Sequence, residues 1–253
     1  MDIATLGGLI IGIGAVAVAY MIEGGHLGAL FHLPALLIVI LGALGAATIT
    51  TSISTLKNIP SLLKVAFARP ETETVNLINE IVALAEKARR EGILGLEQNF
   101  NQAKNPFFKK ALQLVIDGME TTQLRNILET EMAYSGERHQ KGISFFQKLG
   151  GFSPTMGIIG TVLGLIHALS QVDEPSRIAG AIAGAFIATL WGIAMANLCY
   201  LPISDKLRFK HQLESQKLEL ILEGMVSIQS GENPRAIKNK LLSFITPQLR
   251  EKP

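Results

Sequence analysis

The sequence is poor in cysteine, in aromatic residues and in charge. Of its 253 residues only one, Cys199, is cysteine, and 6% are aromatic. A lone cysteine excludes a disulfide framework within the chain. Charged residues make up 17% of the sequence, against about 25% in a usual soluble domain. We therefore expect a protein that keeps much of its chain out of water.

Charge is absent altogether from four long stretches. Each of these runs has about 20 residues or more, enough for a helix to cross a bilayer core of roughly 30 Å. They lie between Asp2 and Glu23, His32 and Lys57, Lys148 and Asp173, and Arg177 and Asp205. Four such runs are difficult to bury in a soluble chain of this size. The sequence therefore predicts four membrane spans, the first retained rather than cleaved as a signal peptide.

Basic residues predict the orientation of these spans. The connection between spans one and two contains no Lys or Arg, and the connection between spans three and four contains only Arg177. The opposite span ends are rich in basic residues, namely Lys57, Lys64, Lys141, Lys148, Lys206 and Arg208. Cytoplasmic loops carry the excess of Lys and Arg. We therefore expect both termini and the long middle segment to be cytoplasmic.

The segments outside the spans have helical periodicity. In TETVNLINEIVALAEKARREG the stripe of Val75, Ile78, Val82 and Ala85 predicts a helix that ends at Gly92. Asn105-Pro106 and Asn233-Pro234 are typical helix starts, Gly231 is a helix stop, and the tail reads as a continuation of span four. No strand-like alternation occurs.

We therefore predict an all-α membrane protein with four transmembrane helices in two hairpins. The first hairpin covers residues 1–54, a helical cytoplasmic domain 55–148, the second hairpin 149–204 and a helical cytoplasmic tail 205–253.

Motifs of enzyme chemistry are missing. The sequence contains no GxxxxGK[ST] phosphate loop, no HExxH and no CxxC, and its five histidines are scattered. A hydrolase built on Ser153 and His167 is one alternative, but fourteen residues of helix would separate the pair by about 21 Å. These residues could meet only across subunits. We predict a protein that is not an enzyme and has no cofactor or fixed metal.

Acidic residues are missing from the interior of all four predicted spans, as are Lys and Arg. A channel that carries ions on a protonatable carboxylate at mid-membrane needs such a residue there. Either the chain moves no ions, or a partner protein supplies the carboxylate.

Small residues recur at helical spacing in the last two spans. They are Gly157, Gly160 and Gly164 in span three and Ala185 and Gly192 in span four. Small side chains let helix backbones approach closely within a membrane. These faces could simply pack on each other within one subunit. The nearby hydroxyls of Thr155, Thr161 and Thr189 favour a polar lining beside a partner helix instead.

Four segments of this chain resemble one family. FSPTMGIIGTVLGLIHAL, IATLWGIAMANLCYLPISDKL, EGMVSIQSGENP and ARREGILGLE are similar to the flagellar stator A subunits, which include MotA and the sodium-type PomA and MotP. The similarity extends over essentially the whole chain and includes the four-span layout. The alternative is a TolQ/ExbB-type proton-channel energiser of envelope processes. It is disfavoured by the extra spans and by ARREGILGLE.

The resemblance implies a five-subunit ring in the bacterial cytoplasmic membrane, around the helices of two MotB/PomB-type B subunits. Each B helix carries an aspartate that binds the driving ion, in agreement with the carboxylate missing here. No nucleic acid is implied. Pro154 matches the proline that opens span three and Pro202 the one that closes span four, and Arg89, Arg90 and Glu97 match residues that meet the rotor protein FliG. Because a missing N–H loosens a helix, we predict that the two prolines serve conformational change. From the residues alone, these three charges would be a solvated helix face.

The resemblance also bears on the ion. Thr161 stands where sodium-type members resemble this sequence and where proton-type members often have alanine, and Thr189 matches a threonine near the B-subunit aspartate. A hydroxyl is a hard oxygen ligand that can replace part of the hydration shell of sodium. We therefore predict transported Na⁺, bound transiently near Thr161 and Thr189 with the B-subunit Asp. The alternative ion is H⁺.

Overall fold

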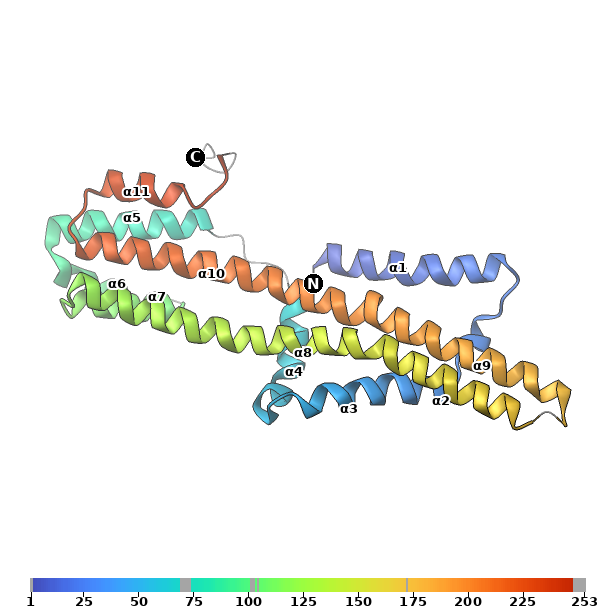
Figure 1. Ribbon diagram of the computed structural model, residues 1–253. Coiled ribbons are helices and arrows are strands. Elements are labelled where there is room, and N and C mark those ends of the chain that lie inside the picture. Colours follow the sequence, from blue (N-terminus) through green and yellow to red (C-terminus); the bar gives the residue numbers. More distant parts are fainter. Residues whose placement is uncertain (1, 69–73, 101–102, 104, 172, 248–253) are drawn as a thin grey trace. The chain divides into compact units, whose positions relative to one another are not determined.

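The computed structural model describes residues 2–68, 74–100, 103, 105–171 and 173–247 (Figure 1). All regular elements in these ranges are helices, which confirms the predicted all-α class. Two compact units are formed. Unit 1 contains Met1–Pro70 and His139–Phe209, and unit 2 contains Glu71–Arg138 and Lys210–Pro253. The predicted middle domain and tail thus both contribute to unit 2.

Unit 1 holds the apolar parts of the long helices. Three helical stretches are long and apolar enough to cross a membrane, namely Ile3–Ile22, Thr121–Leu169 and Arg177–Gln229. The first stretch is α1 and the second is α8. The third stretch begins within α9 (Pro175–Ala194). It passes through a π-helical turn, η4 (Met195–Tyr200), and continues as α10 (Leu201–Gln229). This continuity confirms that the tail prolongs the helix of span four.

The remaining predicted span is shorter. It consists of α2 (Leu33–Leu36), a π-helical turn η2 (Leu37–Leu41) and α3 (Gly42–Ile49). The stretch Leu33–Ile49 reaches about 25 Å at 1.5 Å per residue, the low end of what crosses a bilayer. The number of four spans therefore stays a prediction. A short 3₁₀ helix, η1 (Leu27–Leu30), lies between α1 and α2.

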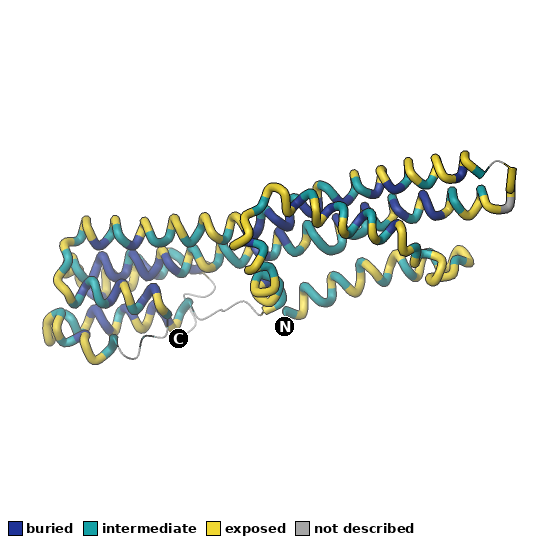
Figure 2. Tube along the Cα trace, turned by 90° about the horizontal axis from the view of Figure 1, so that it is seen from below, coloured by how far each residue is buried: buried dark blue, intermediate teal, exposed yellow. Residues whose placement is uncertain are grey.

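Helix α4 (Ile53–Phe67) follows α3 and runs crosswise to α3 and α8 in both Figure 1 and Figure 2. The Ser52 hydroxyl caps the N-terminus of α4 by accepting a hydrogen bond from the backbone N–H of Thr55 at 3.4 Å. Its apolar side packs on the second apolar cluster of the chain, which includes Ala47, Phe145 and Leu149. This cluster lies within unit 1.

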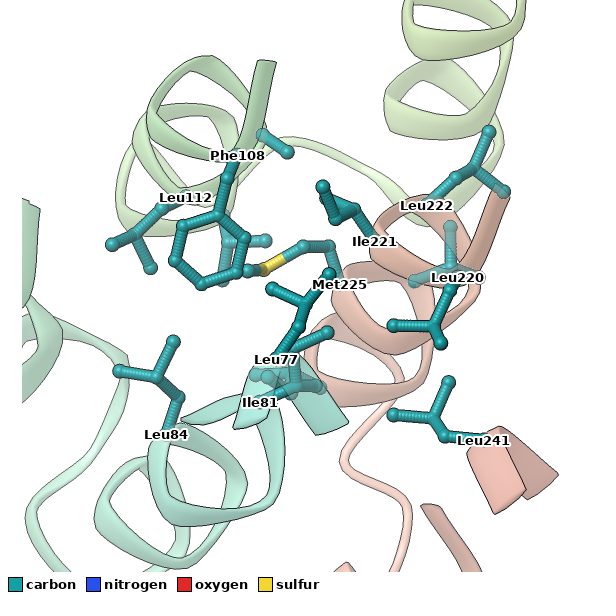
Figure 3. Packing of buried hydrophobic residues seen from close by; sticks show 14 of the residues in the cluster. Leu77, Ile81, Leu84, Phe108, Leu112, Leu220, Ile221, Leu222, Met225 and Leu241 are labelled. Atoms are coloured by element: carbon teal, nitrogen blue, oxygen red, sulfur yellow. The ribbon is translucent and has the colours of Figure 1, made fainter. Parts of the chain in front are cut away.

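Unit 2 is a small helical domain with its own core. It is built from α5 (Thr74–Glu91), η3 (Ile93–Leu96), α6 (Glu97–Phe100), α7 (Pro106–Ile116), α11 (Pro234–Leu242) and parts of α8 and α10. Figure 3 shows the apolar side chains that pack in this core. Helix α5 contributes Leu77, Ile81 and Leu84, and α7 contributes Phe108 and Leu112. Helix α10 contributes Leu220, Ile221, Leu222 and Met225, and α11 contributes Leu241. The burial of this core stabilises the domain independently of any membrane.

The predicted helix boundaries of unit 2 are confirmed. The side-chain oxygen of Asn105 accepts a hydrogen bond from the N–H of Phe108 at 3.1 Å, and that of Asn233 accepts one from the N–H of Arg235 at 3.0 Å. Gly92 and Gly231 end their helices at φ of +79° and +72°, values that favour glycine.

An ion-pair cluster joins three helices of unit 2. The Glu223 carboxylate of α10 binds the Arg125 guanidinium of α8 at 2.7 Å and the Lys240 ammonium of α11 at 2.8 Å. Desolvation alone would raise the pKa of Glu223, but hydrogen bonds from Lys240 and Arg125 outweigh it and hold that pKa below its ordinary value of 4.5. The cluster therefore stabilises the packing of α11 while Glu223 is ionised.

Candidate functional site

Helices α8 and α9 approach each other at their glycines. A side chain on Gly157 would place its Cβ 2.9 Å from the carbonyl oxygen of Ala188, and one on Gly192 would place its Cβ 2.8 Å from that of Ser153. Both positions face backbone atoms, which cannot move aside. The contact therefore requires glycine on each helix.

The other small residues continue this contact. A Cβ on Gly160 would lie 2.7 Å from the Cβ of Ala188, and one on Gly164 would lie 2.7 Å from the Cβ of Ala185. Gly157, Gly160, Gly164, Ala185 and Gly192 thus pack within the chain, as the intrachain alternative requires. Their contact with a partner helix stays a prediction.

Two of the three threonines meet on this contact. The hydroxyls of Thr161 in α8 and Thr189 in α9 hydrogen-bond to each other. The Thr161 hydroxyl also lies 3.0 Å from the carbonyl oxygens of Gly157 and of Ala185. Four oxygen atoms are therefore gathered at one place between the apolar parts of the two helices. Oxygen atoms of this kind are the ligands that hard cations such as sodium prefer.

Thr155 does not join the pair. Its hydroxyl donates to the carbonyl oxygen of Phe152, one turn back on α8, at 2.7 Å. The side chain is exposed. A place for Thr155 in an ion pathway stays a prediction.

No acidic residue completes the oxygen site from the two helices that form it. Neither α9 nor the part of α8 that covers residues 149–169 contains an Asp or a Glu. Among the described residues, no group of three or more His, Cys, Asp or Glu side chains could hold a metal ion. A cation at the hydroxyl pair would need its negative charge from another molecule.

The two predicted prolines occupy different helix positions. Pro154 lies inside α8, where its missing N–H leaves the carbonyl oxygen of Gly150 without its helical partner. Pro202 is the second residue of α10, directly after the π-helical turn η4. Neither π-helical turn was predicted, because wide turns have no reliable sequence signal. The role of the prolines in conformational change stays a prediction.

The three predicted rotor-facing charges lie at one corner of unit 2. Arg89 and Arg90 are in the last turn of α5, and Glu97 begins α6 after η3. All three are exposed, and none makes an ion pair with another described residue. Leu94, between them on η3, is 70% exposed and was not singled out from the sequence. The corner presents charge of both signs around one apolar side chain.

Comparison with known proteins identifies the family. Residues 6–92 match the family model of the motility protein A N-terminal region, and residues 99–220 match that of the MotA/TolQ/ExbB proton channel family. The chain is 34% identical to motility protein A of Borreliella burgdorferi, with 99% of this chain and 96% of that protein covered. The chain belongs to the motility protein A family.

Further relatives agree with this membership. Chemotaxis protein PomA of Vibrio alginolyticus is 35% identical, with 97% of this chain and 96% of that protein covered. The solved structure of C. jejuni MotAB superposes with a TM-score of 0.94 at 30% identity, covering 100% of this chain and 98% of that chain. The flagellar MotAB stator complex from Bacillus subtilis gives 0.92 at 34% identity, with 98% of both chains covered. The predicted resemblance is confirmed, and the motility protein A relatives are not enzymes.

Proposed function

We propose that this chain is the A-type subunit of a flagellar stator, which couples ion flow across the bacterial cytoplasmic membrane to torque on the rotor. Membership of the motility protein A family and the match to two MotAB structures over at least 98% of this chain support this role. The motility-specific N-terminal match disfavours the TolQ/ExbB alternative.

The observation that carries the proposed ion chemistry is the hydroxyl pair of Thr161 and Thr189 without an acidic neighbour on either helix. A B subunit with an aspartate in its single membrane helix supplies the missing negative charge. The two hydroxyls then offer oxygen atoms to a dehydrating cation, which suits sodium, whereas a proton needs only the carboxylate and water. Sodium is therefore the proposed coupling ion, and the proton is the alternative.

The remaining parts of the proposal follow from the family resemblance. Five copies surround two B-subunit helices, and both termini face the cytoplasm. The exposed corner at Arg89, Arg90 and Glu97 meets the rotor protein FliG. The basic span ends support this orientation, because Lys and Arg are retained on the cytoplasmic side.

The test uses a strain without stators of its own. The chain is expressed alone, with its B subunit, and with a B subunit whose membrane aspartate is replaced by asparagine. Single-motor speed is measured against sodium concentration at fixed pH. We expect rotation only with the intact B subunit and a speed that rises with sodium.

Two results would contradict parts of the proposal. Rotation by the chain without a B subunit would show that no partner carboxylate is needed. Speed that ignores sodium and collapses when the proton gradient is removed would overturn the sodium assignment while leaving the stator role intact.

A further inference from the structure

Helix α4 begins close to the end of a predicted membrane span. Helix α3 ends at Ile49 and α4 begins at Ile53, so only three residues connect them. Three residues of extended chain reach roughly 11 Å at most. Helix α4 also runs crosswise to α3 and α8 in both views (Figures 1 and 2). It therefore turns away from the direction of the predicted span directly after that span ends, as a helix on a membrane surface would.

One side of α4 packs against other helices of unit 1, so the opposite side faces away from them. Leu56, Ile59 and Leu62 pack on the apolar cluster around Phe145. Gly142 of α8 leaves room for this contact, since a Cβ there would lie 2.6 Å from the Cδ1 atom of Leu62. Rotation of α4 about its axis would expose these apolar side chains to water.

The outward side carries two cations without an anion. Lys57 and Lys64 are seven residues apart, so they lie on the same side of the helix about 10 Å from each other along its axis. Both are exposed, and α4 contains no acidic residue. Neither lysine makes an ion pair with another described residue, whereas Lys206 pairs with Asp2.

An exposed apolar residue accompanies the two lysines. Ile53 lies one turn before Lys57 on the same side and is 72% exposed. An anionic phospholipid complements this surface, because its phosphate binds ammonium groups and its acyl region accepts an apolar side chain. Free phosphate would satisfy the lysines but would leave Ile53 in water.

We propose that α4 binds the headgroups of anionic phospholipids through Lys57 and Lys64, with Ile53 in the adjoining acyl region. This proposal rests on the predicted membrane span that contains α3. It does not depend on the coupling ion or on contact with a rotor. The bound lipids would fix α4 against the membrane surface beside the protein.

The test uses the purified complex of the full chain with its B subunit in neutral detergent. Dioleoylphosphatidylglycerol, dioleoylphosphatidylcholine and inorganic phosphate are titrated separately, and bound lipid is followed by native mass spectrometry together with thermal unfolding. The variants are Lys57→Gln/Lys64→Gln and the charge-keeping Lys57→Arg/Lys64→Arg. Arg235→Gln/Lys238→Gln is the matched control, because it removes two exposed cations from α11 in unit 2.

We expect wild type and control to bind phosphatidylglycerol more tightly than phosphatidylcholine and to gain thermal stability from it. The glutamine variant should lose affinity for phosphatidylglycerol about fivefold per lysine, roughly twenty-five-fold for both, while the arginine variant keeps it. Equal unfolding temperatures without added lipid establish that the variants are folded. If the double variant does not fold, each single glutamine variant should still show its own fivefold loss.

Three outcomes would overturn the proposal. They are equal binding of the two lipids by wild type, equal losses in the α4 and α11 variants, and full competition by inorganic phosphate. Each can occur in a complex that still rotates with sodium, so failure here is distinguishable from failure of the stator proposal.

Discussion

A Cβ atom on Gly157 of α8 would lie 3.2 Å from the Cα atom of Gly192 on α9. Such a distance between a side chain and a backbone is tighter than ordinary packing, so the two helices touch through their main chains. Replacement of either glycine by alanine should force α8 and α9 apart, with a loss of about 1–3 kcal/mol. Thermal unfolding of the purified complex measures the loss.

Gly180→Ala is the matched control, because a Cβ at Gly180 meets no atom within 4 Å. We expect this control to unfold at the temperature of wild type or at a slightly higher one, because alanine favours a helix more than glycine does. Equal unfolding of all three variants would show that the helix pair adapts to added side chains.

Replacement of Thr161 or Thr189 by valine should separate ion use from packing. Valine keeps the size of threonine but removes the hydroxyl, and Thr161 contributes its oxygen to a site with Thr189 and two carbonyl groups. The speed of single motors should require more sodium in either variant, or should be lost, whereas Thr161→Ser should retain the sodium response. Valine variants with an unchanged sodium dependence would remove these hydroxyls from the ion pathway.

Charge reversal at the corner of unit 2 should affect the rotor contact without affecting the fold. Arg89 and Arg90 are exposed and without an ion-pair partner among the described residues, so Arg89→Glu should leave expression and assembly unchanged. Swimming should be impaired, and a compensating reversal on the rotor protein should restore it. Failure of the variant to reach the membrane would instead give these residues a structural role.

Restoring the N–H group at Pro154 or Pro202 should stiffen the helices. Pro154→Ala permits a hydrogen bond to the carbonyl oxygen of Gly150, so thermal stability should stay equal or rise. Torque at high load should fall, because the stiffer helices bend less at these positions. Wild-type torque in both alanine variants would mean that the prolines only mark helix positions.

Loss of Glu223 should loosen α11. The carboxylate binds Arg125 and Lys240, so Glu223→Gln should lower the stability of unit 2 by about 1–2 kcal/mol at neutral pH, between the effects of surface and buried pairs. The folded pKa of Glu223 lies below 4.5, so this contribution is present above the unfolded pKa and is lost as the pH falls through the folded value. The wild-type advantage in thermal unfolding should therefore vanish in acid. If wild type remains more stable than Glu223→Gln at a pH below the folded pKa of Glu223, the ionised carboxylate is not the source of the difference.

The sequence allowed the long helices and several of their ends to be predicted, because these signals are local. Asn105, Asn233, Gly92 and Gly231 act within a few residues of their own positions, and long uncharged runs need no knowledge of neighbours. The core of α5 was predicted less well. Ile78 and Ala85 are buried as expected, but Val75 and Val82 are only half-buried. Leu77, Ile81 and Leu84, which were not predicted, are buried as well.

Contacts between distant segments could not be predicted in the same way. The small residues of α8 and α9 were compatible with either an intrachain or a partner contact, since periodicity identifies a face but not what covers it. The meeting of Thr161 with Thr189 depends on the register of two helices whose threonines are 28 residues apart. The exposure of Leu94 could not be predicted, because Leu96 has the same side chain in the same 3₁₀ turn and is fully buried.

The hydroxyl pair has fewer hydrogen atoms than acceptors. Thr161 and Thr189 bring two hydrogens to a group of four oxygens, two of which are the carbonyls of Gly157 and Ala185. Each hydroxyl donates only once, so several arrangements of the same two hydrogens satisfy the group. Turning an O–H bond moves no heavy atom and is fast compared with any helix motion. The pair can therefore change from bonding to itself to offering lone pairs to a cation while both helices stay still.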